Sequence, residues 1–144
     1  MSADRLKVRD ASGDGYEVLD YDGEPIAICA TIVDAARFVH GRAARFWLDW
    51  DRTVISGPPA PGDFCASFLG SDSIGRIRAE RHGASAGSWF WSISTHDDRW
   101  RKHGGQRGRE PSKDLAVAAL EREFTRYLAD TPPGPSPYAL AKGL

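Results

Sequence analysis

At 144 residues and 15.8 kDa, the chain is long enough for one domain or two very small ones. Apolar residues make up 41% and charged residues 27%, which is ordinary for a soluble globular protein. The longest uncharged stretches are far short of the roughly 20 apolar residues that span a bilayer, and two cysteines do not make a disulfide framework. Residues 1–10 alternate charged and apolar side chains and lack the apolar segment of a signal peptide, so we expect a cytoplasmic protein with reduced thiols.

The net charge of −1 is unevenly distributed. Residues 1–72 hold 7 basic and 12 acidic side chains, residues 73–109 hold 8 and 3, and residues 110–144 hold 4 and 5. The basic segment can recruit an anionic partner, or the acidic half can fold beside it and neutralise it. The sequence pI of about 6.4 favours neutralisation, because nucleic-acid binders usually carry a global basic bias.

The first part of the chain predicts three strands and a helix. The strands are expected over Leu6–Arg9, Tyr16–Asp20 and Ile26–Ala30, with a turn at Asp22-Gly23. Thr31 is expected to begin the helix, because Thr31 and Asp34 have the spacing of a capping box.

The end of this helix has two interpretations. Apolar residues recur every three or four positions and keep their phase past Gly41, which favours a helix to about Phe46. They are Ile32, Ala36, Val39, Ala43, Phe46 and Trp50. Gly41 could instead end the helix, and the residues from Phe46 to Ile55 would fit a strand equally well.

Three prolines and two glycines between Ser56 and Gly62 predict a linker, which divides the chain into halves 1–55 and 63–130. The second half predicts strands over Phe64–Leu69, Ile74–Glu80 and Ser88–Thr95. In this half, Arg76 and Arg78 are expected on the sheet face opposite Ile77. A helix capped by Ser112 follows, and residues 131–144 form a loose Pro-rich tail.

The expected fold class is α+β, an antiparallel sheet with helices packed on one face. Both halves have the order strand-strand-strand-helix, which suggests an internal duplication. The core of the second half is expected to contain Phe64, Ile77, Trp89, Trp91, Ile93, Val117, Leu120, Phe124 and Leu128.

Three short motifs carry a family resemblance over residues 63–128. They are Ile74-Gly75-Arg76-Ile77, Trp89-Phe90-Trp91-Ser92-Ile93 and Ser112-Lys113-Asp114-Leu115-Ala116. Together they resemble a family of small uncharacterised proteins from alphaproteobacteria, which implies no activity and no catalytic residues. The element order is also similar to that of AP2-like modules, which read DNA with the exposed face of a sheet.

Residues that could support catalysis do not form a recognisable motif. His96, Asp97, Asp98 and His103 lack a ligand spacing typical of metal sites. Cys65 with His40, His82, His96 or His103 could supply a nucleophile and a base, but Cys65 lies in a predicted strand, where thiols are usually inert. Gly104–Gly108 lacks the Lys-Ser/Thr ending of a phosphate loop. We expect no enzyme activity, no metal and no cofactor.

The remaining candidate is a basic segment from Arg99 to Arg109, which mixes basic, aromatic and flexible residues in a predicted loop. With the outer sheet face, it gives the candidate anion contacts Arg76, Arg78, Arg99, Trp100, Arg101, Lys102, Arg107 and Arg109. The expected function is a non-catalytic binding or adaptor module with an unknown protein partner. The alternative is a nucleic-acid-binding protein that uses these residues; no membrane partner is expected.

Overall fold

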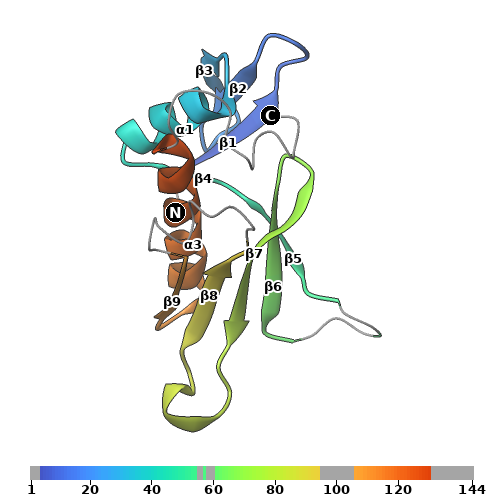
Figure 1. The fold of residues 1–144 in the computed structure, drawn as a ribbon, viewed down its shortest axis with the longest axis vertical. Coiled ribbons are helices and arrows are strands. Elements are labelled where there is room, and N and C mark those ends of the chain that lie inside the picture. Colours follow the sequence, from blue (N-terminus) through green and yellow to red (C-terminus); the bar gives the residue numbers. More distant parts are fainter. Residues whose placement is uncertain (1–3, 55–56, 58–60, 95–105, 131–144) are drawn as a thin grey trace. The chain divides into compact units, whose positions relative to one another are not determined.

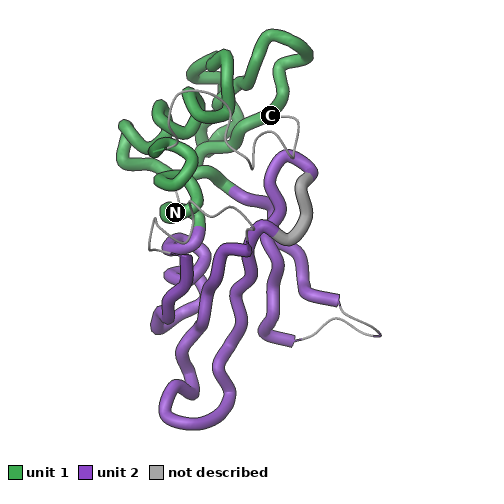
Figure 2. The backbone as a smooth tube through the Cα atoms, viewed as in Figure 1, with its two compact units in different colours: residues 1–47, 121–144 green, residues 48–120 purple. Residues whose placement is uncertain are grey.

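A computed structural model describes residues 4–54, 57, 61–94 and 106–130 (Figure 1). The chain divides into two compact units, unit 1 with Met1–Trp47 and Glu121–Leu144, and unit 2 with Leu48–Leu120 (Figure 2). The last helix, α3 (Lys113–Ala129), contributes to both units. Each unit has its own sheet, and the sheets are mainly antiparallel, which confirms the α+β class.

Unit 1 contains a four-stranded sheet in the order β3-β2-β1-β4. Its strands are β1 (Arg5–Asp10), β2 (Tyr16–Leu19), β3 (Pro25–Cys29) and β4 (Arg45–Phe46). The first three are antiparallel neighbours, as consecutive strands joined by short turns usually are, and β4 pairs parallel to β1. The three predicted strands are confirmed. Strand β4 was not predicted, because two residues are too few to show an alternation of apolar and polar side chains.

Helix α1 (Ile32–Gly41) packs on β2, β3 and β4 through a stripe of buried apolar side chains. Its start is confirmed, since the Asp34 N–H donates to Thr31 Oγ1 at 3.1 Å. Its expected continuation to Phe46 is wrong. Ala43 has a left-handed φ of 57°, and the N–H groups of Ala43 and Ala44 donate back to His40 O and Val39 O, 3.0 and 3.1 Å away. This Schellman motif ends the helix.

A buried charge network ties the end of α3 to the sheet of unit 1. Glu121 accepts from Arg5 Nε and Nη2, at 3.0 and 2.7 Å, and from Arg45 Nε at 2.8 Å. Arg45 Nη1 also donates to Asp4 at 2.6 Å. Thr125 Oγ1 accepts from the Phe46 N–H and donates to Glu121 O, each at 2.8 Å, so β4 is fixed to the helix by side-chain bonds.

Unit 2 contains a five-stranded sheet in which every pair of neighbours is antiparallel and consecutive in the chain. Its strands are β5 (Asp49–Arg52), β6 (Asp63–Phe68), β7 (Ser71–Ala79), β8 (Trp89–Ile93) and β9 (Arg107–Glu110). A short 3-10 turn, η1 (Gly83–Ser85), lies at the tip of the β7–β8 hairpin (Figure 1). The two sheets differ in strand number and pairing, so the element order does not show a duplication.

The predicted linker from Ser56 to Gly62 falls between β5 and β6, which pair with each other through Asp49↔Ser67 to Arg52↔Phe64. The two compact units divide instead after Trp47 and after Leu120. The strand alternative for residues 46–55 is therefore closer to the structure than a long helix. The predicted tail, residues 131–144, lies outside the described residues.

The inner face of the unit 2 sheet packs on the first part of α3. The Ser112 cap is confirmed, because its Oγ accepts from the Leu115 N–H at 3.2 Å. Leu120 packs so closely on Gly75 that a Cβ at residue 75 would lie 2.8 Å from Leu120 Cδ1. Of the expected core residues, Ile77, Trp91, Ile93 and Leu120 are buried here, whereas Phe64, Trp89 and Val117 are only partly buried. Phe124 and Leu128 are buried but belong to unit 1.

Candidate anion-binding surface

The outer face of β7, β8 and β9 carries a group of basic residues around one aromatic ring. The register pairs Arg78 with Phe90 and Phe90 with Arg109, so these three side chains form one row across the sheet. The next row is formed in the same way by Arg76, Ser92 and Arg107. Residues directly opposite in a sheet project from the same face. We call Arg76, Arg78, Phe90, Arg107 and Arg109 the arginine face.

Phe90 lies between two guanidinium groups. Arg78 Cζ is 5.2 Å and Arg109 Cζ is 5.5 Å from the centroid of the Phe90 ring, within the range of cation–π contacts. The ring thereby holds two positive charges, one from each of the strands that flank β8. Phe90 is partly exposed, and both arginines are exposed.

Arg76 is on the same face, but its charge is already paired. Its Nε and Nη2 donate to the two Asp63 carboxylate oxygens at 2.8 and 2.5 Å, and Thr53 Oγ1 donates to Asp63 at 2.6 Å. These hydrogen bonds, chiefly that from Arg76, lower the pKa of the Asp63 carboxyl although burial opposes the shift. The same pair raises the pKa of Arg76. Arg76 therefore belongs to a structural ion pair with Asp63 and is not an open contact for a phosphate.

The other three arginines are less tightly paired, although Arg78 lies opposite Asp63 in the register and its charge contributes to the lowered pKa of that carboxyl. Arg109 pairs with Glu80 only at 3.5 Å, and its side chain is 55% exposed. Within the described residues, neither Arg78 nor Arg107 forms an ion pair, and both are exposed. The arginine face therefore offers about three open guanidinium groups, two of which are held by Phe90.

Strand β9 corrects the prediction that Arg99–Arg109 is a loop. Arg107 and Arg109 are strand residues that alternate outward on either side of Gly108. Gly108 faces inward below Trp91, where a Cβ would lie 2.8 Å from Trp91 Nε1. Only glycine allows this close approach. The alternation Arg-Gly-Arg-Glu was visible in the sequence, but the glycines before it favoured a loop.

Four predicted contacts, Arg99, Trp100, Arg101 and Lys102, lie outside the described residues, as do His96, Asp97, Asp98 and His103. Cys65 is described, with its Sγ 3.1 Å from Thr53 Oγ1, and no hydrogen bond joins it to His40 or His82. Among the residues that the structure describes, no three His, Cys, Asp or Glu side chains are grouped as a metal site.

A second basic and aromatic cluster, which the sequence did not predict, lies in unit 1. Trp47 stacks on Tyr21, with ring centroids 5.2 Å apart, and Arg5 and Lys7 lie over Trp47 at 4.8 and 5.3 Å. Its charges already have internal roles, because Arg5 binds Glu121 and Lys7 Nζ donates to Trp47 O at 3.3 Å. The cluster is therefore better explained as packing.

No protein-family model, curated protein or solved structure matches this chain. The resemblance to the alphaproteobacterial family and to AP2-like modules thus remains a prediction. In the part of the chain that the structure describes, no helix has the length and apolar character needed to cross a membrane. The arginine face is the surface whose chemistry most directly suggests a partner.

Proposed function

We propose that this protein is a non-catalytic binding module that recognises a polyanionic partner with the arginine face. The observation that carries the proposal is the row Arg78–Phe90–Arg109, in which one ring on β8 holds two exposed guanidinium groups from the strands on either side. Guanidinium groups bind phosphate and carboxylate through paired N–H donors. Groups that are already held in place lose less conformational entropy when a partner binds.

The neighbouring residues support an extended anion rather than a single small one. Arg107 lies one row away from Phe90 on the same face, two residues along β9 from Arg109. Rows two residues apart are separated by about 6.6–6.8 Å along a strand. Three open guanidinium groups spread over this area match several anionic groups on one chain.

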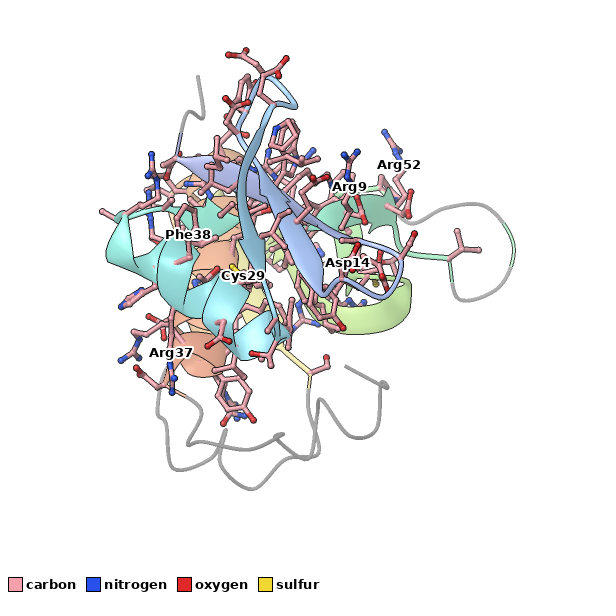
Figure 3. All side chains as sticks on the ribbon, turned by 90° about the horizontal axis from the view of Figure 1, so that it is seen from above. Arg9, Asp14, Cys29, Arg37, Phe38 and Arg52 are labelled. Carbon is pink, nitrogen blue, oxygen red and sulfur yellow. The ribbon has the colours of Figure 1, made fainter. Side chains whose placement is uncertain are left out.

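The test compares two double variants that remove the same charge. Arg78→Gln/Arg107→Gln removes two open guanidinium groups from the arginine face. The control, Arg42→Gln/Arg52→Gln, removes two exposed arginines that lie over Phe38 and Phe64, at 5.4 and 5.9 Å, outside that face. Arg52 and Phe38 are labelled in Figure 3.

Heparin and oligonucleotides are titrated against each protein between 50 and 300 mM salt. We expect wild type and control to bind with a log K against log salt slope of about −2 to −3. The face variant should bind at least about ten times more weakly, with a slope closer to zero by about 2. Equal binding by the face variant and the control would rule out the arginine face, and no binding by wild type at 50 mM salt would reject the proposal.

A protein partner is the second candidate, and strand β3 supports it. Among the described strands, β3 forms one edge of the unit 1 sheet, and its Ile26 and Ile28 are 38% and 67% exposed. An edge strand with exposed apolar side chains can add a strand from another protein. If it does, Ile28→Lys should abolish the binding of a co-purifying protein that Arg78→Gln/Arg107→Gln retains; retention by Ile28→Lys would exclude β3.

A further inference from the structure

We infer that the polyanion is a single-stranded nucleic acid and that one of its bases stacks on the Phe90 platform, formed by the Phe90 ring and the Arg78 and Arg109 guanidinium groups. This inference rests on the proposed function and adds the class of partner. The evidence is the position of an aromatic ring at the centre of the basic surface, in register with both arginines.

The ring itself favours a nucleic acid over other polyanions. A sulfated sugar or an acidic peptide would satisfy the guanidinium groups, but it has no planar group to place on an aromatic ring. Bases stack on aromatic side chains and on guanidinium planes, and this contact contributes about 1–3 kcal/mol per base. Phe90 and its two arginines supply both kinds of surface in one row.

The sheet geometry favours a single strand over a duplex. The platform residues belong to three neighbouring strands of a continuous antiparallel sheet, and they project from regular strand positions rather than from a protruding helix. A duplex shows its base edges only within its grooves, where a helix or a two-stranded ribbon must enter. In a single strand, the flat faces of the bases are open to stacking.

The second row completes the expected contact. Ser92 is opposite both Arg76 and Arg107, and it is partly exposed. A nucleic-acid strand with one base stacked on the Phe90 platform would place an adjoining phosphate over this second row. Arg107 of that row has no acidic partner among the described residues. Arg76, in the same row, is held by Asp63.

The experiment measures fluorescence anisotropy of full-length protein with four probes at 100 mM salt. They are a 12-nucleotide oligothymidine, an abasic phosphodiester strand of equal length, a duplex of equal length, and heparin. Wild type should bind oligothymidine at least about fivefold more tightly than the abasic strand or the duplex. This comparison needs no variant and so does not depend on how a substitution affects folding.

Two variants then test the platform. Phe90→Leu should weaken oligothymidine binding by about fivefold or more and leave heparin binding within twofold, whereas Phe90→Tyr should retain both. Equal affinity for oligothymidine and the abasic strand, a preference for the duplex, or an unchanged affinity in Phe90→Leu would overturn the inference while heparin binding still supports the proposed function. If no probe binds, both fail.

Discussion

Arg45 donates a hydrogen bond to Glu121 at 2.8 Å in the interior of unit 1, where the Glu121 side chain is completely buried. Arg5 donates to both oxygens of the same carboxylate, and Asp4 accepts a second bond from Arg45. A buried carboxylate without its partners is strongly destabilising, although a complete pair adds little over an apolar one. The network therefore constrains which single changes unit 1 tolerates.

Arg45→Met should lower the free energy of unfolding by about 3–5 kcal/mol, because it leaves Glu121 and Asp4 with fewer donors. The control is Arg122→Met, since Arg122 pairs with Asp4 at 3.3 Å with a side chain that is 58% exposed. Exposed pairs contribute about 0–1 kcal/mol. Urea denaturation measures both, and a loss below about 1 kcal/mol for Arg45→Met would contradict the role given to this network.

Asp63 should make stability depend on pH in the acidic range. Its folded-state pKa is lowered from 3.8, mainly by the Arg76 hydrogen bonds. The unfolded state therefore takes up a proton first as pH falls, so the contribution of Asp63 is present above about pH 4 and is lost at lower pH. The difference in unfolding free energy between wild type and Asp63→Asn should be about 1–3 kcal/mol at pH 7 and should shrink below pH 4. A difference that is constant from pH 7 to pH 3 would show that the ion pair does not form.

The contact between Gly75 and Leu120 predicts coupled effects. Gly75→Ala should cost about 1–3 kcal/mol, because its Cβ would meet Leu120 Cδ1 at 2.8 Å and Ser92 O at 3.2 Å. Leu120→Ala should cost about 2–5 kcal/mol through the cavity it leaves. The double variant should lose less than the sum of the two, because the added methyl group enters that cavity. Additive losses in denaturant melts would mean that the two residues do not touch.

Ala43→Gly should stabilise the protein by about 0.5–1 kcal/mol. Ala43 is exposed and has a left-handed φ of 57°, which costs about 1–2 kcal/mol for an L-residue and nothing for glycine. The greater freedom of glycine in the unfolded chain offsets part of that gain. Ala44→Gly, one residue later, lacks a positive φ and should destabilise by about 0.5–1 kcal/mol. Thermal melts that rank the two variants in the opposite order would exclude the Schellman motif.

Local chemistry explains why several expectations were correct. Thr31 and Ser112 each accept a bond from the N–H three residues later, a pattern that depends only on neighbouring residues. The side-chain alternation of β8, with Trp91 and Ile93 buried, also follows from the chain itself. The same alternation placed Arg76 and Arg78 on the face opposite Ile77. The basic residues of the candidate site could thus be found before the structure was known.

The long-range features could not be found in this way. The apolar stripe past Gly41 looked helical, but a left-handed alanine ends the helix, and the Phe46 N–H of β4 donates to Thr125 of α3. The pairing of β5 with β6 across the proline-rich segment depends on residues on both sides of it. Sequence periodicity carries no information about which distant segment becomes the neighbour.

The sequence alone determined the fold class, the helix starts and the outward position of the β7 arginines, because each depends on interactions between residues a few positions apart. Tertiary structure decided which of those arginines keeps an open charge. Asp63 is 13 residues from Arg76 and neutralises it, while Phe90 and Arg109 come into line with Arg78 only when β8 pairs with both β7 and β9. Charge on a surface depends on which residues face one another across strands, and that is set by register rather than by the order of residues in the chain.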